Sequence, residues 1–165
     1  MRESAIEVVL LALAGVVALL AFASLLPRCS GGGTGSSRAL VRASWTLTPG
    51  VLNPAVTQAT IRSTICRSGF TRTIRPPVRY TNDLKRKGLR AYRLRGPPSA
   101  YQEDHLISLE LGGSPDDPRN LWPEPYPRAS VVDRIENELN AKICRGELTL
   151  EQAQREESAL KHRDG

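Results

Sequence analysis

The chain has 165 residues, which leaves room for one domain of ordinary size and an appendage. Apolar residues make up 40% of it, a normal share for a globular protein, so a buried core is possible. The net charge is +6, and the three cysteines include no C-x-x-C pair, which argues against a zinc knuckle.

The first segment is the most apolar part of the chain. Residues 8–26 carry no charge and are about as long as a bilayer crossing requires. Arg2 lies before this run, and Pro27-Arg28 follows it. We therefore expect residues 1–28 to form an uncleaved transmembrane anchor. A cleaved signal peptide is the alternative, because Ala21-Phe22-Ala23 has the small-x-small form of a cleavage site. Either reading predicts an extracytoplasmic protein, membrane-anchored or secreted.

Residues 29–43 are predicted to be a flexible linker. The stretch from Ser30 to Ser37 contains only glycine, serine and threonine, a composition that forms no core. The linker would separate the anchor from a domain that we expect over residues 44–165.

The elements predicted at the start of this domain are short. Thr57 is a suitable N-cap for a short helix through Ile65. Arg75-Pro76-Pro77 forces extended backbone. Thr81 is then expected to cap a helix that Gly88 ends.

Charge is segregated along the domain. Residues 61–100 contain eleven basic side chains and a single acid, whereas residues 101–165 contain fourteen acids and eight basic side chains. Arginine predominates in the basic half and binds phosphate oxygens in bidentate fashion, which favours contact with a nucleic-acid backbone. A solvated surface, or attraction to anionic lipid, is the alternative. The residues expected to contact phosphates are Arg75, Arg79, Lys85, Arg86 and Lys87.

The stretch from Gln102 to Asn120 carries the residues suited to chemistry. Asp104 and His105 are adjacent inside an apolar run, Gly112-Gly113 follows, and Asn120 comes fifteen positions after the histidine. Neighbouring strand residues point to opposite faces, but at a strand end both can line one site. Histidine can take a proton from water near neutral pH, and aspartate is a hard oxygen ligand of the kind Mg²⁺ prefers. The pattern predicts metal-assisted hydrolysis of a phosphate ester.

Asp104-His105, Gly112-Gly113 and Asn120-Leu121 resemble the motif of the HNH (His-Me finger) endonucleases. The resemblance covers about residues 48–154, and the run from Glu103 to Pro125 is similar to a bacterial branch of that family. It implies an α+β domain with a small ββα-metal core and additional short helices. In that core a histidine ends the first strand, a loop and a second strand follow, and a helix completes the metal site.

The resemblance also implies roles for individual residues. His105 would activate water, and Asn120 would belong to the catalytic set as the residue that braces the loop. Asp104 would bind a divalent metal, which we expect to be Mg²⁺ or Mn²⁺, with Zn²⁺ as a further possibility.

The helix of the expected metal site is predicted to begin at Ser130, with Asp133 as its capping-box partner. At about 100° per residue, Asp133, Glu136 and Asn140 fall on one flank of its apolar stripe. The resemblance implies that Asp133 or Glu136 completes the metal site, although many HNH proteins have a histidine or asparagine there. The alternative is that Asp133 only caps the helix and Glu136 is solvated. The stripe itself consists of Val132, Ile135, Leu139 and Ile143.

Two cysteines and one further helix complete the sequence-based picture. Cys66 and Cys144 stand at predicted helix ends, and in an exported domain we expect them to form a disulfide, with two buried free thiols as the alternative. The capping box at residues 149–152 predicts a last helix to about Lys161. His162 would then lie in a charged tail outside the site.

The expected function is that of a metal-dependent endonuclease that hydrolyses phosphodiester bonds, with DNA as a more suitable partner than RNA. No recognition-helix signature is present in the sequence, so little sequence preference is expected. One alternative is a non-catalytic nucleic-acid-binding protein with a decayed HNH site, because the helix lacks a histidine. Another is a membrane-anchored structural domain whose basic face meets lipid headgroups.

Overall fold

The structure is a computed structural model that describes residues 40–165. The expected membrane anchor, residues 1–28, and most of the expected linker lie outside the described residues. Among residues 40–165, no helix has the length and apolar character that a bilayer crossing requires.

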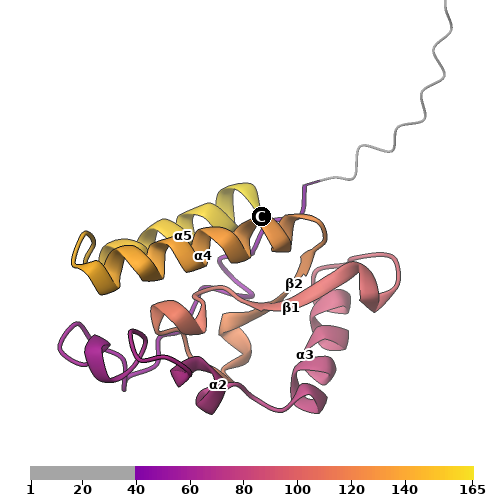
Figure 1. The fold of residues 1–165 in the computed structure, drawn as a ribbon. Helices are drawn as coiled ribbons and strands as arrows, with labels where there is room; N and C mark the ends of the chain where they lie inside the picture. The colour runs from indigo at the N-terminus through magenta and orange to yellow at the C-terminus, as the bar shows by residue number, and fades with distance from the viewer. Residues whose placement is uncertain (1–39) are drawn as a thin grey trace, which may run out of the picture. The chain divides into compact units, whose positions relative to one another are not determined.

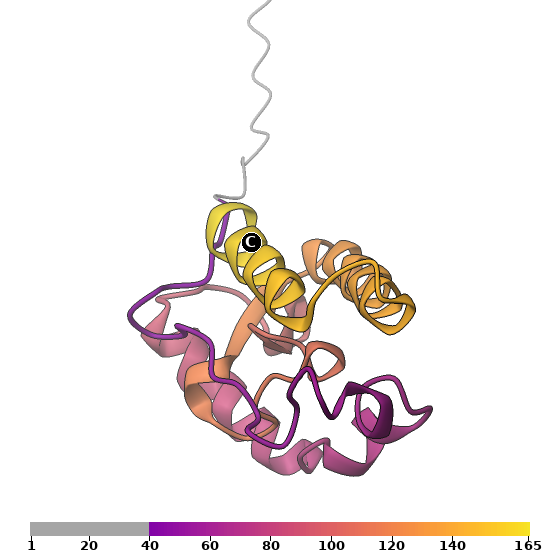
Figure 2. The same ribbon diagram turned by 90° about the vertical axis from the view of Figure 1, so that its left-hand side faces the viewer.

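A two-stranded antiparallel sheet lies between helices, which makes the domain α+β, as the sequence predicts (Figure 1). Strand β1 (Tyr101–His105) pairs with β2 (Leu121–Pro125) so that His105 lies opposite Leu121. Helices α4 (Arg128–Arg145) and α5 (Leu150–Asp164) lie side by side on one side of this sheet, and α3 (Val78–Ala91) packs on the other. Figure 2 shows the same pairing of α4 with α5.

Helix α3 is longer than the sequence predicts, and the expectation that Gly88 ends it is wrong. The helix starts directly after Pro77, before Thr81, and continues through Gly88 to Ala91. A Cβ atom on Gly88 would lie 2.8 Å from Cδ of Pro123 in β2. The glycine therefore allows α3 to approach the sheet closely, and it does not terminate the helix.

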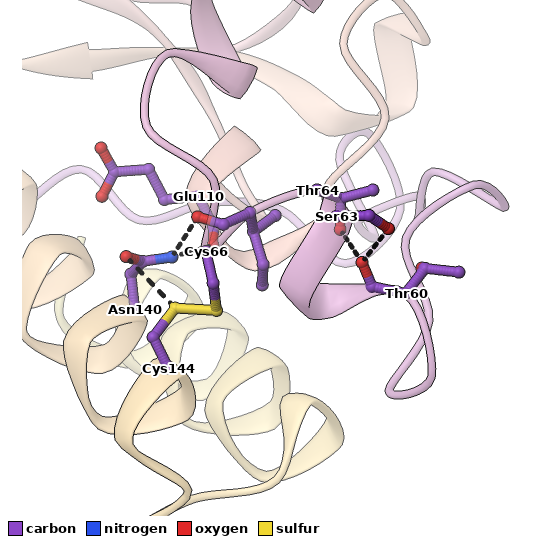
Figure 3. The surroundings of a disulfide bond; sticks show 8 residues. Thr60, Ser63, Thr64, Cys66, Glu110, Asn140 and Cys144 are labelled. Atoms are coloured by element: carbon purple, nitrogen blue, oxygen red, sulfur yellow. Dashed lines mark hydrogen bonds between the residues drawn. A yellow bond between two sulfur atoms is a disulfide. The ribbon is translucent and has the colours of Figure 1, made fainter.

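The predicted helix from Thr57 to Ile65 is also wrong. Only a 3₁₀ turn, η1 (Ile61–Ser63), forms there, and a short helix, α2 (Phe70–Ile74), follows it. The carbonyl of Thr60 accepts hydrogen bonds from the hydroxyls of Ser63 (3.0 Å) and Thr64 (2.7 Å), as Figure 3 shows. Such local side-chain bonds compete with regular helical bonding, which explains the irregular turn.

Helix α4 begins at Arg128, two residues before Ser130, and Pro127 precedes it without a side-chain cap. The expected capping role of Asp133 is therefore wrong. The predicted apolar stripe does pack inward, with Val132, Leu139 and Ile143 buried.

Helix α5 has the predicted capping box, in which Thr149 and Gln152 bond to each other's backbone. It extends beyond Lys161 to Asp164, so His162 lies within the helix and not in a tail. His162 is buried and stacks on Trp45, with ring centroids 3.4 Å apart.

Cys66 and Cys144 are joined by a disulfide, which attaches the segment after η1 to the last turn of α4 (Figure 3). Beside it, the side-chain amide of Asn140 donates hydrogen bonds to the carbonyls of Glu110 (2.8 Å) and Ile65 (3.3 Å). The larger apolar core adjoins this junction and contains Val56, Ile61, Ile65, Ile107, Leu111, Leu139, Ile143, Leu150 and Ala153.

Residues 40–43, which the sequence assigns to the linker, belong to the folded domain. Ala43 is buried, and its N–H donates to the carbonyl of Lys161 at 3.0 Å. Its small side chain belongs to a second apolar cluster with Leu106 and Trp122. Val41 and Ala43 thus pack against this cluster, although they lie next to a glycine-rich stretch.

Removing the disulfide should lower the stability of the domain. The bond joins residues separated by 78 positions, so Cys66→Ser combined with Cys144→Ser should lower the free energy of unfolding by about 4 kcal/mol. Urea titration without reductant measures this loss, and wild type treated with reductant is the control. Mass spectrometry of unreduced wild type should find one peptide species containing both cysteines. Alkylation of both thiols in the folded, unreduced protein would contradict the pairing.

Candidate functional site

The last two residues of β1 carry the side chains that the motif singles out, and they have different partners. The His105 imidazole lies against the loop between the strands, with Nε2 3.0 Å from the carbonyl oxygen of Pro115. The Asp104 carboxylate lies toward α5, where Oδ2 accepts a hydrogen bond from Lys161 at 2.7 Å. Both side chains are buried, and they diverge as alternation along a strand requires, so the expectation that both line one site at the strand end is not met.

Three carboxylates from β1 and α4 come together. Asp104, Asp133 and Glu136 each present an oxygen within 4.8 Å of the others. Asp133 and Glu136 are three residues apart on α4 and therefore share one flank of the helix. Asp133 accepts a hydrogen bond from the amide of Gln102 at 3.0 Å. Glu136 is buried, so the alternative in which this residue is solvated is excluded.

A fully buried lysine from α5 lies against this cluster. The Lys161 ammonium donates to Asp104 (2.7 Å), to Glu136 (2.7 Å) and to the backbone carbonyl of His105. It also forms an ion pair with Glu157, one turn earlier on α5, at 3.2 Å. Lys161 therefore connects β1, α4 and α5 through charge-assisted hydrogen bonds.

The sequence analysis did not predict that Glu157 and Lys161 belong to the site, although the spacing of residues along α5 indicates it. Leu150, Ala153, Glu157 and Lys161 follow one another at spacings of three and four residues, and all four are buried. These positions form the inward stripe of a helix, so two charged residues on it had to be paired inside the protein.

The charge states of the cluster follow from burial and from Lys161. Burial opposes the ionisation of Asp104, but the neighbouring ammonium outweighs it and holds the pKa of Asp104 below its usual value. Burial raises the pKa of Glu124, with a further contribution from the charge of Asp104, to about 9. Among residues 40–165 no donor reaches either oxygen of Glu124. At pH 7 Glu124 is therefore a neutral acid.

His105 has the properties of a base. Burial lowers the pKa of its imidazole below the usual value, against the opposing effects of the Pro115 carbonyl and of Asp104. The ring is therefore neutral at pH 7. Because a carbonyl oxygen only accepts hydrogen bonds, Nε2 carries the ring proton, and Nδ1 is the basic atom.

Asn120 holds the loop between the strands and offers no free polar atom to a substrate. Its side-chain oxygen accepts from the N–H of Ile107, and its NH₂ group donates to the carbonyls of Ile107 and Ser114, at 2.9–3.0 Å. A Cβ atom on Gly113 would lie 1.7 Å from the backbone oxygen of Ile107, so only glycine fits beside the hydrogen bonds that Asn120 makes. These contacts are those of a residue that holds the loop in position.

The basic residues expected to contact phosphates do not form one uniform surface. Arg79 and Lys87 are exposed on α3, and Arg86 is exposed but pairs with Asp83. Lys85 is half-buried and donates to the carbonyl of Tyr101 at 2.8 Å, so it supports the start of β1.

Arg75 lies on the His105 side of the sheet. Its positive charge contributes to the lowered pKa of His105, and it also acts on the half-buried Glu110. It lines a pocket of about 460 Å³ with Pro77, Tyr80 and Pro115, the residue whose carbonyl contacts His105.

No protein-family model, no curated protein and no solved structure was found to match the chain. The function is therefore inferred from the site residues and their geometry.

The Glu124→Gln substitution should reduce the decrease in the free energy of unfolding that accompanies a rise in pH. The folded-state pKa of about 9 lies above the ordinary value of 4.5, so between these values the folded protein binds more protons than the unfolded chain. Stability therefore falls as the pH rises through that window, by up to about 1.4 kcal/mol per pH unit for one such group. Glutamine mimics the neutral acid and does not titrate.

Urea titrations in EDTA between about pH 5 and pH 9 would measure this dependence. The Glu124→Gln variant should lose less stability over that range than wild type does. Glu138→Gln is the matched control, because Glu138 is exposed on α4, and it should behave as wild type. Equal pH slopes for wild type and Glu124→Gln would show that the buried group is ionised.

Proposed function

We propose that the chain is a metal-dependent endonuclease that hydrolyses phosphodiester bonds of DNA, with β1, β2 and α4 as a ββα-metal core. The observation that carries this proposal is the cluster of Asp104, Asp133 and Glu136 at the strand that His105 ends. Carboxylates and a neutral imidazole are the groups that metal-assisted hydrolysis requires.

The donor set of the cluster suits a hard divalent cation. All three candidate ligands are carboxylates, and Lys161 uses one oxygen of Asp104 and one of Glu136. Burial raises the pKa of Glu136 well above its usual value, so this carboxyl group would release its proton when a cation binds. Oxygen ligands favour Mg²⁺ or Mn²⁺ over Zn²⁺, whose usual ligands include nitrogen or sulfur. When bound, such a metal would stabilise negative charge on the phosphate.

His105 would accept the proton of the attacking water. Its Nε2–H group donates to the Pro115 carbonyl, which fixes the ring and leaves Nδ1 as the acceptor. The low pKa of the ring keeps it unprotonated at neutral pH. Asn120 and Gly113 hold the loop that contains Pro115 and so maintain the orientation of the base.

Exposed arginines would hold the DNA backbone. Arg75 lines the pocket that contains Pro115, and Arg79 and Lys87 lie on α3, which packs against the same sheet. Contacts of this kind bind phosphates without reading bases, so we propose cleavage with little sequence preference.

A second candidate function is DNA binding without cleavage. The specific observation in its favour is Lys161, whose ammonium already lies against Asp104 and Glu136 as a cation would. If this ion pairing prevents metal binding, the basic residues would still bind DNA.

His105→Ala should remove cleavage and spare DNA binding. Loss of a positioned general base lowers a rate by about 10²–10⁴-fold, and the imidazole is not among the phosphate-binding residues. Plasmid digestion and a filter-binding assay on the same preparation would measure the two effects. His162→Ala, which removes the other histidine, should retain cleavage provided that its melting curve shows it folded. Cleavage by His105→Ala at the wild-type rate would refute the assignment of the base.

Neutral substitutions in the basic half should flatten the salt dependence of DNA binding. The logarithm of affinity falls linearly with the logarithm of salt concentration, and each lost phosphate contact reduces the slope by about one unit. Arg79→Gln and Lys87→Gln should each show this change in fluorescence-anisotropy titrations. Arg145→Gln is the control, because Arg145 pairs with Glu147 at the end of α4. If the salt dependence of DNA affinity is unchanged in both test variants, Arg79 and Lys87 do not contact the DNA backbone.

A further inference from the structure

The position of Lys161 is more unusual than a surface ion pair. Its side chain has no exposed area, and three carboxylates lie within 3.2 Å of its nitrogen. The backbone of the same residue is also held, because its carbonyl accepts a hydrogen bond from Ala43. The ammonium group is thus fixed at the centre of the acidic cluster.

Several carboxyl groups surround this ammonium. Asp104, Glu136 and Glu157 contact it, and Asp133 lies within reach of the first two. Lys161 is the one basic side chain in residues 40–165 that forms an ion pair with any of these four acids.

Glu124 is an independent sign that the cluster can hold more positive charge. This side chain is fully buried next to Asp104, and within the described part of the chain no donor reaches either of its oxygens. A buried carboxyl group without a donor is costly, and a nearby cation relieves that cost.

We propose that the Lys161 ammonium is the resident cation of the acidic cluster and that it sets how tightly a divalent metal binds there. The inference rests on the proposed function in using the same carboxylates as its metal site. It adds a residue that determines metal affinity and that contacts neither substrate nor reacting atoms.

The physical basis is competition for the same oxygens. The ammonium bonds to Asp104 and Glu136 in the metal-free protein, which keeps their carboxyl groups together without a metal. A divalent cation placed against the same two carboxylates would lie close to the ammonium, and the two positive charges would repel each other. Lys161 therefore stabilises the empty site and weakens metal binding.

A purely structural tether would behave differently. If Lys161 only attached α5 to the sheet, its loss would weaken the fold, and a metal ion would not repair the damage. If it is the resident cation, a divalent metal can take over its charge.

The test is Lys161→Met in the full chain, because methionine keeps much of the length of the side chain and removes its charge. Titration with Mn²⁺ alone, without DNA, should show affinity increased by about tenfold or more. Mn²⁺ should also raise the melting temperature of the variant more than that of wild type. Lys161→Arg keeps the charge and should show neither gain. Lys142→Met removes an exposed lysine that pairs with Glu138 and should match wild type.

Equal or weaker Mn²⁺ binding by a folded Lys161→Met variant would overturn the proposal. If this variant does not fold without metal, Lys161→Met combined with Glu157→Gln removes one charge of each sign and takes its place. Tighter Mn²⁺ binding by the double variant supports the resident cation, and unchanged binding overturns it. Failure of both variants to fold with Mn²⁺ present also overturns it, because the metal then cannot replace the ammonium.

Metal binding is measured here without a nucleic acid, so this test is separate from that of the proposed function. A wild-type chain that binds Mn²⁺ but cuts no DNA would refute the nuclease and leave the role of Lys161 standing. If the wild-type chain cuts DNA and the Lys161→Met variant has unchanged Mn²⁺ affinity, the nuclease proposal stands and the role of Lys161 is refuted.

Discussion

The buried ion cluster around Lys161 is the constraint on which the rest of the domain depends. Taking several carboxylates out of water is tolerable only if a cation and further hydrogen bonds accompany them. Lys161 meets this condition with atoms from β1, α4 and α5, and so joins these three elements. Removing one partner of such a buried pair typically costs about 3–5 kcal/mol, which is a large part of the stability of a small domain.

The same cluster determines the chemistry that its surroundings can perform. It keeps Asp104 ionised at the end of β1, while Glu124 next to it stays neutral. On the other side of the strand, burial leaves the His105 imidazole unprotonated and bonded to the Pro115 carbonyl. Acid, base and anionic ligands therefore coexist within a few residues because each has a different local environment.

Features with a local cause could be predicted from the sequence. The capping box at Thr149 acts on its own neighbours, and the helical period of α4 places Val132, Leu139 and Ile143 on its buried face. Features that depend on distant contacts were missed. Gly88 looks like a helix terminator until Pro123 packs against it. Lys161 looks like a solvated helix end until three carboxylates surround it.

The most direct measurement is the digestion of supercoiled plasmid by the purified chain in Mg²⁺ or Mn²⁺, with EDTA as the control. A metal-dependent nuclease should convert the plasmid to nicked and then linear DNA with either metal, and EDTA should stop the conversion. Millimolar metal should be needed, because Lys161 occupies part of the carboxylate cluster. Plasmid that stays supercoiled with both metals, in a preparation shown to bind DNA, would contradict catalysis and favour the binding protein.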